Sequence, residues 1–313
     1  METQAKFDSG LVKLPAWFKQ EIPDMNKVRS MKELFRGSRL HTVCESANCP
    51  NMGTCWKEGV ATFMILGGTC TRACRFCAVP AGRPDLVDLE EPQNVALAVK
   101  ELGLRYVVVT SVARDDIEDE GAEQFAKTIH AIRKLTPSVK VEVLIPDFSA
   151  KEESLRILSD AAPEVISHNI ETVRRLAPYI RPQALHDRSL QVLRRFRALN
   201  PKSFVKSSLM IGIGETDDEI IEVMQELVRA GCQILTIGQY LAPTQRKRHL
   251  PVKRFFSPEE FAKYAQIGLD MGFVYVESGP LVRSSYIAEK GYQTAVEALN
   301  IKKRGFQSNA TKV

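Results

Sequence analysis

The 313-residue sequence has no apolar segment of the kind that carries a protein into or through a membrane. Its first ten residues lack the apolar core of a signal peptide, and no apolar run approaches the roughly 20 residues that span a bilayer. The longest apolar run, at residues 60–68, has about the length of one strand. We therefore expect a cytoplasmic protein without a membrane partner.

The sequence also has little excess of either charge, with 43 Lys and Arg residues against 38 Asp and Glu. A net charge of +5 permits an acidic macromolecular partner but does not single out nucleic acid. Paired histidines and an aromatic-rich basic face are both missing, which argues against a zinc-dependent nucleic-acid module. We expect no nucleic-acid partner.

Two common phosphate-binding motifs are absent as well. No G-x-G-x-x-G follows the first predicted strand, so a dinucleotide-binding site of that type is not indicated. The Gly-x-Gly at residues 210–214 is too short for a P-loop and lacks its lysine. We interpret that run as a close approach of the backbone at the end of a strand.

What the sequence does contain is a regular alternation of strand and helix patterns from about residue 60, after short helices expected in residues 1–40. The alternation predicts an α/β protein with a parallel sheet and outer helices, as an open doubly wound sheet or a complete or partial barrel. The predicted strands are residues 60–66, 105–110, 140–145, 165–168, 204–210, 232–237 and 273–276. The predicted helices are residues 92–102, 121–135, 151–160 and 186–199, one from the capping box at Thr216 to Gly231, and one from Ser257 to Gly272. A basic tail from Lys302 is expected to be frayed.

Cysteine is concentrated in one place, because six of the seven cysteines fall within residues 44–77. The first triplet, spaced C-x4-C-x5-C, is Cys44, Cys49 and Cys55. The second triplet, spaced C-x3-C-x2-C, is Cys70, Cys74 and Cys77. In a reducing compartment such clusters are more often metal ligands or redox groups than disulfides, and the odd total argues against complete pairing. The seventh, Cys232, is expected to serve packing at the start of a buried strand.

Each triplet provides three thiolates to a centre that normally takes four ligands. In the second triplet, soft thiolates at the tight C-x3-C-x2-C spacing suit an iron–sulfur cluster, and the shortfall indicates one iron left open to a ligand from solution. The alternative is a zinc site with one unseen ligand, although structural zinc sites are usually closed and four-coordinate. Since the carboxyl ends of parallel strands carry functional sites, we expect the second triplet there, after the first strand.

The second triplet lies in the sequence CTRACRFC, with the aromatic Phe76 just before the last cysteine. This sequence resembles the C-x3-C-x-φ-C motif of the radical S-adenosylmethionine superfamily. The resemblance implies a [4Fe–4S] cluster whose open iron binds the amino and carboxylate groups of S-adenosylmethionine. One electron then yields methionine and a 5′-deoxyadenosyl radical, which abstracts hydrogen from an unactivated carbon, chemistry beyond side chains alone.

Further blocks, between about residues 40 and 288, make the whole chain resemble the lipoyl synthase family. These blocks are CESANCPNMGTCW, TSVARDD, SHNIETV, MIGIGET, GQYLAPT and SGPLVRSSY. The resemblance implies a sulfurtransferase that inserts two sulfur atoms, at C6 and C8, into a protein-bound octanoyl chain. It implies a partial (β/α)6-type TIM barrel at residues 59–278, with extensions at residues 1–58 and 279–313 that hold an auxiliary iron–sulfur cluster.

In that family the first triplet binds the auxiliary [4Fe–4S] cluster, and a serine of an R-S-S-Y motif, here residues 283–286, holds its fourth iron. Ser285 is the expected ligand and Ser284 the alternative. A serine oxygen is harder than a thiolate and is displaced more readily when the cluster gives up sulfur. Arg283 is expected to orient the serine loop or touch the cluster, with a surface salt bridge as the competing role. An auxiliary cluster that only transfers electrons is the alternative to a sulfur source.

The resemblance also directs attention to polar residues at the later strand ends. The expected cofactor-binding residues are Phe76, Thr110, Ser111, Asn169, Glu171 and Arg188. The sequence TSVARDD replaces the commoner Gly-Gly-Glu, and within it Arg114 and Asp115 are further candidates, whereas Asp116 is as readily a solvated loop residue. His168 is expected to be structural. Arg188 could pair with the methionine carboxylate, with an ordinary exposed arginine as the alternative.

The partners implied by the resemblance are octanoylated lipoyl carrier domains, namely E2 subunits of 2-oxoacid dehydrogenases and the H protein of glycine cleavage. An electron donor such as ferredoxin or flavodoxin and an iron–sulfur carrier for rebuilding the cluster are also implied. A basic patch at residues 245–249, with Lys253 and Arg254, could receive an acidic carrier, although most charge runs are simply solvated. The rival functions are another radical sulfur-inserting enzyme and a two-cluster electron carrier.

Overall fold

The computed structural model describes residues 14–19, 25–47, 49–57, 62–244 and 246–310. Its centre is an eight-stranded sheet whose strand order follows the sequence, from β1 to β8. The strands are β1 (His41–Thr42), β2 (Thr62–Ile65), β3 (Tyr106–Ser111), β4 (Lys140–Leu144), β5 (Val165–Ser167), β6 (Phe204–Ile211), β7 (Ile234–Gln239) and β8 (Tyr275–Gly279). The short β1 is antiparallel to β2, and every later neighbouring pair is parallel. The sheet curves into a partial barrel. Within the described residues β8 pairs with β7 alone, so this barrel stays open on one side.

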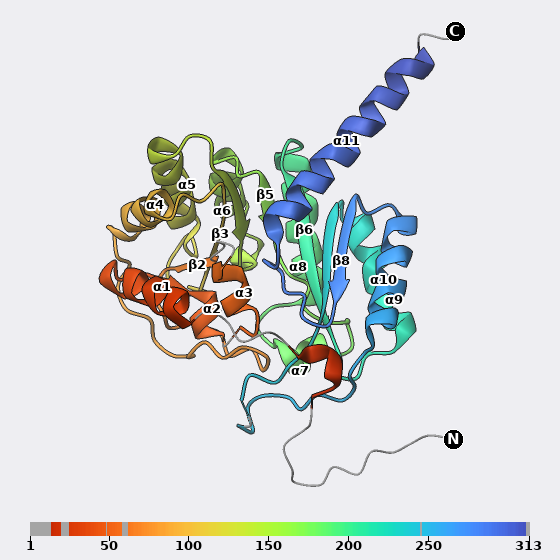
Figure 1. Ribbon diagram of the computed structural model, residues 1–313, viewed down its shortest axis with the longest axis horizontal. Helices are drawn as coiled ribbons and strands as arrows, with labels where there is room; N and C mark the ends of the chain where they lie inside the picture. Colours follow the sequence, from red (N-terminus) through yellow and green to blue (C-terminus); the bar gives the residue numbers. More distant parts are fainter. Residues whose placement is uncertain (1–13, 20–24, 48, 58–61, 245, 311–313) are drawn as a thin grey trace.

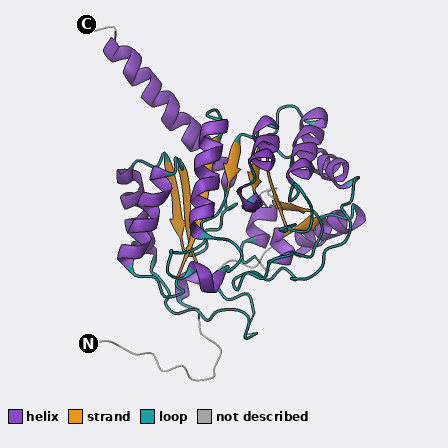
Figure 2. Cartoon of the chain, turned by 180° about the vertical axis from the view of Figure 1, so that it is seen from behind, coloured by secondary structure: helices purple, strands orange, loops and turns teal. Residues whose placement is uncertain are grey.

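One helix follows each strand from β2 to β7 and packs on the outer face of the sheet (Figures 1 and 2). These helices are α4 (Glu91–Glu101), α5 (Ala122–Leu135), α6 (Glu152–Asp160), α8 (His186–Leu199), α9 (Asp217–Arg229) and α10 (Pro258–Met271). The shorter α7 (Ala177–Ile180) and the 3-10 turn η2 (Phe148–Ala150) lie in the loops between them. Six strand–helix units followed by a last strand confirm the predicted partial (β/α)6-type barrel.

The local sequence explains where these elements begin and end. β3 is buried on both faces, as expected of its run of β-branched residues. α9 begins at a capping box in which Thr216 and Glu219 satisfy each other's backbone N–H groups, and α10 begins at another at Ser257. Gly272 ends α10 with a φ of 108°, a left-handed conformation that favours glycine.

The strand predictions differ from the structure mainly at the ends. Residues 60 and 61 of the first predicted strand lie outside the described residues, and the strand is seen at Thr62–Ile65. Cys232 lies in the turn before β7 instead of starting it, and it is buried as predicted. The tail that was predicted to be frayed is helical in the structure as far as residue 310, because α11 (Ala288–Ala310) continues past Lys302. Ala, Lys and Gln favour helices, and a helix that is nucleated by packing extends at little cost.

The segments before and after the barrel cover different parts of it. The leading segment contains η1 (Ala16–Phe18), α1 (Met25–Gly37), α2 (Val43–Ser46) and α3 (Met52–Lys57). Phe35 of α1 packs against Trp56 of α3 and Phe63 of β2, with ring centroids 5.7 Å apart in both pairs, which fixes this layer on β2. Within the described parts of the chain, every helix is too short or too polar to cross a lipid bilayer.

α11 starts at the amino ends of the strands and then projects from the body (Figure 1). Its Tyr292 packs on Tyr106 and Phe204, the first residues of β3 and β6. Beneath it a buried ion pair joins Lys206 to Glu142 at 2.6 Å, and the Tyr106 hydroxyl donates to the same carboxylate. This end of the barrel is therefore closed, which leaves the carboxyl ends of the strands for a site.

Candidate functional site

A cavity of about 950 Å³ opens at the carboxyl ends of the strands. The loop after β2 brings the second triplet to its wall, where the sequence predicted it: Cys70, Cys74 and Cys77 all line the cavity and are partly exposed. Burial raises the pKa of the Cys74 thiol to about 12, and the neighbouring thiols of the triplet add to the rise. A cationic metal centre would reverse this effect, because it stabilises thiolates.

Cys70 accepts two backbone hydrogen bonds. Its sulfur accepts hydrogen bonds from the backbone N–H of Arg72 at 3.4 Å and of Ala113 at 3.2 Å. Ala113 lies in the loop after β3, so two neighbouring loops meet on this sulfur. N–H groups that point at a cluster ligand stabilise its negative charge.

The first triplet lines the same cavity. Cys44 belongs to α2, Cys55 belongs to α3, and Cys49 lies in the turn between these short helices. Burial raises the pKa of the Cys44 thiol to about 11 and that of Cys55 to about 12. Cys44 and Cys49 add to the rise at Cys55, so the three sulfurs are close enough to repel one another when ionised.

The donor sets fit iron–sulfur clusters. All seven cysteines lie in the described residues and none forms a disulfide. Across that part of the chain, no three Cys, His, Asp or Glu side chains converge on the position of a single metal ion. A single zinc ion would require convergence within about 2.3 Å of each sulfur, whereas each sulfur around a [4Fe–4S] core binds a different iron. Three partly separated thiols therefore suit a cluster better than one ion.

The R-S-S-Y segment reaches the first triplet from the other end of the chain. The hydroxyl of Thr62, at the start of β2, donates to the Ser285 hydroxyl at 2.9 Å. The Asn51 side chain donates to the Leu281 carbonyl at 2.6 Å. Arg283 is partly buried: burial lowers its pKa, and the Cys49 thiol opposes that change. Arg283 thus faces the first triplet, and Ser284 and Ser285 both line the cavity.

Five of the six residues predicted to bind cofactor line the cavity, namely Phe76, Thr110, Ser111, Asn169 and Glu171. Within the described residues, the Ser111 hydroxyl and the side-chain amide oxygen of Asn169 are buried without a hydrogen-bond partner. Glu171 accepts a hydrogen bond from the Asn169 amide at 2.9 Å, and burial raises its pKa. The Thr110 hydroxyl is already used, because it donates to the Leu144 carbonyl at 2.7 Å.

Arg188 does not line the cavity. Its guanidinium donates to Asp147 at 3.3 Å, and Asp147 lies on the cavity wall. In the loop after β3, Arg114 pairs with Asp116 at 2.8 Å. His168, expected to be structural, lines the cavity, and its two ring nitrogens contact the Ile145 carbonyl at 3.0 Å and the Ser189 hydroxyl at 2.9 Å.

The sequence analysis missed one cation at this site. Arg181 is 3% exposed, lines the cavity and donates to the Asn169 carbonyl and the Ser189 hydroxyl. No carboxylate forms an ion pair with it among the described residues, and its Nε has no partner there. No local pattern marks this residue, because only the folded chain buries it beside Glu171.

In the structure, some residues of the predicted basic patch are exposed and others have protein partners. Residue 245 lies outside the described residues, and Arg246 and Lys247 are exposed at the cavity. Arg248 and His249 contact the Cys77 carbonyl at 3.3 and 3.0 Å. The Arg254 guanidinium lies 4.2 Å from the centre of the Phe256 ring and pairs with Glu260, so it contributes little free charge.

A cysteine triplet with one missing ligand, at the carboxyl edge of a partial barrel, defines a radical S-adenosylmethionine protein, and residues 64–227 match the Radical SAM superfamily. The chain shares this fold with HydG, a maturase of the [FeFe]-hydrogenase, with a TM-score of 0.55 at 16% identity over 68% of this chain and 49% of that one. It shares it also with Streptococcus suis SuiB bound to S-adenosylmethionine, with a TM-score of 0.51 at 13% identity over 79% and 58%.

Similar curated proteins identify the family of this chain within the superfamily. The chain is 53% identical to a lipoyl synthase of Rubrobacter xylanophilus, over 90% of this chain and 87% of that one. It is 50% identical to a lipoyl synthase of Caldanaerobacter subterraneus subsp. tengcongensis, over 91% and 99%. The chain belongs to the lipoyl synthase family. It is a radical S-adenosylmethionine enzyme and sulfurtransferase that uses [4Fe–4S] clusters and S-adenosylmethionine, as predicted.

Proposed function

We propose that this protein inserts two sulfur atoms, at C6 and C8, into an octanoyl chain that a lipoyl carrier domain holds on a lysine. The observation that carries the proposal is that two cysteine triplets face one cavity. When bound, S-adenosylmethionine and one cluster supply a 5′-deoxyadenosyl radical for each hydrogen abstraction, and the auxiliary cluster supplies the sulfur. Two molecules of S-adenosylmethionine are consumed for each lipoyl group.

The second triplet holds the radical cluster in this proposal. Its three thiols leave one iron to a small molecule with an amino and a carboxylate group. Ser111 and Asn169 offer unpaired polar atoms, and Glu171 offers a carboxylate, on the same cavity wall. We assign these residues, with Phe76 and Thr110, to cofactor binding. Arg188 reaches this wall through Asp147, and it also donates to the Gln183 carbonyl at 3.5 Å.

The first triplet and Ser285 hold the auxiliary cluster. Thr62 fixes the Ser285 hydroxyl beside Cys44, and Arg283 brings a positive charge toward Cys49. A weakly matched oxygen ligand suits a cluster that must open to release sulfide. In this scheme residues 1–58 and 279–313 are extensions that complete the auxiliary site, and residues 59–278 form the barrel.

The cavity has room for cofactor and acyl chain together. Its volume of about 950 Å³ is at the upper end of the roughly 300–1,000 Å³ typical of ligand pockets. Apolar side chains on its wall suit an octanoyl chain, and they include Met210, Leu241, Leu250, Val252 and Val282. Arg246 and Lys247 stand at this cavity as exposed cations that can steer an acidic carrier domain, an E2 subunit or an H protein.

The test is anaerobic reconstitution with iron and sulfide, followed by incubation with S-adenosylmethionine, a reductant and an octanoyl-lysine peptide. Mass spectrometry should find the dithiolated peptide together with 5′-deoxyadenosine. Ferredoxin or flavodoxin replaces the chemical reductant in a second assay, and an iron–sulfur carrier should restore multiple turnovers. Formation of 5′-deoxyadenosine without a thiolated peptide would contradict sulfur insertion and favour a different radical reaction.

A further inference from the structure

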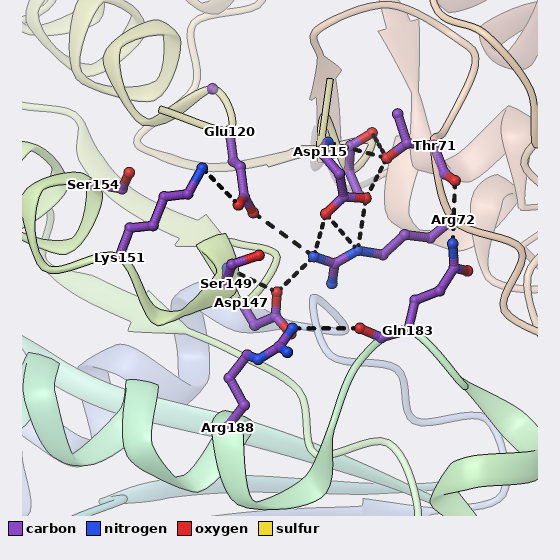
Figure 3. A network of polar contacts seen from close by, with 12 residues as sticks. Thr71, Arg72, Asp115, Glu120, Asp147, Ser149, Lys151, Ser154, Gln183 and Arg188 are labelled. Atoms are coloured by element: carbon purple, nitrogen blue, oxygen red, sulfur yellow. Dashed lines mark hydrogen bonds and ion pairs between the residues drawn. The ribbon is translucent and has the colours of Figure 1, made fainter. Parts of the chain in front are cut away.

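Arg72 lies between Cys70 and Cys74 in the loop of the second triplet, and its guanidinium reaches the carboxylates of Asp115, Glu120 and Asp147 (Figure 3). Its Nε and Nη2 donate to Asp115 at 3.0 and 2.5 Å, and Nη2 also donates to Asp147 at 2.7 Å. Arg72 is 7% exposed and Asp147 is 0% exposed. One guanidinium thus ties the cluster loop to the chain after β3 and the chain after β4.

Two further cations complete this network (Figure 3). Glu120 lies 3.7 Å from Arg72 and pairs with Lys151 at 3.1 Å, and Arg188 pairs with Asp147. Three cations therefore face three carboxylates, which balances the charge around the buried members Arg72, Glu120 and Asp147. A balanced network of this kind is rigid, and removal of the Arg72 guanidinium leaves buried carboxylates with fewer partners.

The backbone after Asp147 is held in an unusual conformation. Phe148, Ser149 and Ala150 have φ values of 44°, 47° and 56°, a left-handed region that such residues rarely adopt. The Ser149 N–H donates to Asp147 Oδ1 at 3.2 Å, and the buried Phe148 packs on Phe125. Strain of this kind persists only where the surrounding structure fixes it, often near functional sites. Here the strained backbone directs the Asp147 carboxylate toward Arg72.

The same network sets the surroundings of Cys70. The N–H and the hydroxyl of Thr71 both donate to the Ala113 carbonyl, at 3.1 and 3.0 Å. The Thr71 hydroxyl also contacts Asp115 at 2.5 Å. Because Arg72 also binds Asp115, the loop after β3 is held beside Cys70. The Ala113 N–H can then reach the Cys70 sulfur.

We propose that Arg72 is a positioning residue for the radical cluster: it clamps the cluster loop to the ends of β3 and β4 and so keeps two backbone N–H groups on the Cys70 sulfur. The inference rests on the proposed function, because it needs a cluster on the second triplet. N–H donors to a cluster sulfur stabilise the reduced state and raise the reduction potential. Partners in the outer shell of a metal site also slow the loss of the metal.

A purely structural role is the competing explanation, and the chain offers a matched control. Lys206 and Glu142 form another buried ion pair, at 2.6 Å, at the opposite end of the barrel. Lys206→Met removes the cation from the buried Glu142, and Arg72→Gln removes the closer of the two cations that pair with the buried Asp147. Both changes should lower stability, but only the change at Arg72 should alter the cluster. Arg72→Lys keeps the charge without the planar fork that joins both carboxylates.

The experiment uses the reconstituted protein with both clusters. The radical cluster is identified as the one whose electron paramagnetic resonance signal changes when S-adenosylmethionine is added. We expect Arg72→Gln to lose this cluster to a chelator about tenfold faster or more, and to have a more negative reduction potential for it. In both measurements Arg72→Lys should lie between Arg72→Gln and the unaltered chain. The auxiliary cluster should be retained in both variants, and Lys206→Met should match the unaltered chain in both measurements.

Asp115→Asn provides a second test if Arg72→Gln fails to fold, because Asp115 is exposed and the change leaves the Arg72–Asp147 pair in place. It should shift the potential in the same direction by a smaller amount. Loss of both clusters together, or cluster properties like those of Lys206→Met, would overturn the role of Arg72. If the unaltered protein itself has no cluster that responds to S-adenosylmethionine, the proposed function fails and this inference fails with it.

Discussion

The hydroxyl groups of Thr62 and Ser285 lie 2.9 Å apart, although 223 positions separate the two residues in the sequence. Thr62 begins β2, the first parallel strand, and Ser285 follows β8, the last one. Burial raises the pKa of the Cys44 thiol, and the backbone N–H of Thr62 opposes that rise. The contact therefore joins the two edges of the open barrel beside the first triplet, where the proposed auxiliary cluster would take its fourth ligand.

Ser285→Ala tests whether this hydroxyl is that ligand. We expect the auxiliary cluster to be lost about tenfold faster or more, because one iron loses its protein ligand. The thiolated product should fall with it, while 5′-deoxyadenosine continues to form at the second triplet. Iron analysis and mass spectrometry of the peptide measure the two effects.

Ser284→Ala is the matched control, since the neighbouring hydroxyl also lines the cavity. It should keep both clusters and most of the thiolation activity. The reverse pattern, with Ser284→Ala inactive and Ser285→Ala active, would assign the ligand to Ser284.

The two triplets should be separable in function. Cys74→Ala removes a proposed ligand of the radical cluster, so formation of both 5′-deoxyadenosine and thiolated peptide should stop. Cys49→Ala should retain the signal that responds to S-adenosylmethionine and continue to form 5′-deoxyadenosine, but give no thiolated peptide. Equal loss of 5′-deoxyadenosine in the two variants would contradict this division of roles.

Gly238 in β7 makes room for the segment that carries Ser285. A Cβ at this position would lie 2.0 Å from the Val282 carbonyl oxygen, a backbone atom that cannot move aside alone. We expect Gly238→Ala to cost about 1–3 kcal/mol of stability through overpacking. It should also displace residues 282–285, and so weaken retention of the auxiliary cluster more than that of the radical cluster.

Gly37 provides the comparison for this change, because a Cβ there meets nothing within 4 Å. Gly37→Ala should shift the unfolding free energy by no more than about 1 kcal/mol and leave both clusters in place. Thermal unfolding and iron release, measured on both variants, separate the local effect from a general one. Equal iron release from the two variants would show that the close approach at Gly238 does not support the auxiliary site.

Local signals in the sequence were sufficient for much of the fold. The valine run of β3 and the capping boxes at Thr216 and Ser257 depend on neighbouring residues, so they could be read without a structure. The spacing of the second triplet likewise indicated its chemistry and its place after the first strand. What these signals share is that the interacting residues lie within a few positions of each other.

The contacts that hold the site together could not be read in this way. Arg72 meets Asp115 and Asp147 across 43 and 75 positions, and any of many loop carboxylates could have been the partner. Arg181 is cationic in a short loop, and only the packing around it shows that it is buried. The prediction that Arg188 touches the cofactor likewise depended on a side-chain direction that the sequence does not specify, and its guanidinium is held by Asp147.

His168 should make the stability of the protein depend on pH. Its folded pKa is lowered from 6.5 to about 4, chiefly by burial, with Arg181 and Arg72 adding to the drop and Asp147 opposing it. Between these two values the unfolded chain takes up a proton that the folded chain refuses, so stability falls as the pH falls. The contribution of neutral His168 to the unfolding free energy is complete above pH 6.5. About 2 kcal/mol of it is lost between pH 7 and pH 5.

Urea unfolding of the reconstituted protein at pH 7 and pH 5 measures this dependence. His168→Gln can still donate to the Ile145 carbonyl and accept from Ser189, but it does not titrate. Its loss of stability between the two pH values should be smaller than that of the unaltered chain by about 2 kcal/mol, because the other groups cancel in the comparison. His130→Gln, at an exposed position of α5, should reproduce the unaltered profile. Equal losses in all three chains would mean that His168 does not carry the acid sensitivity.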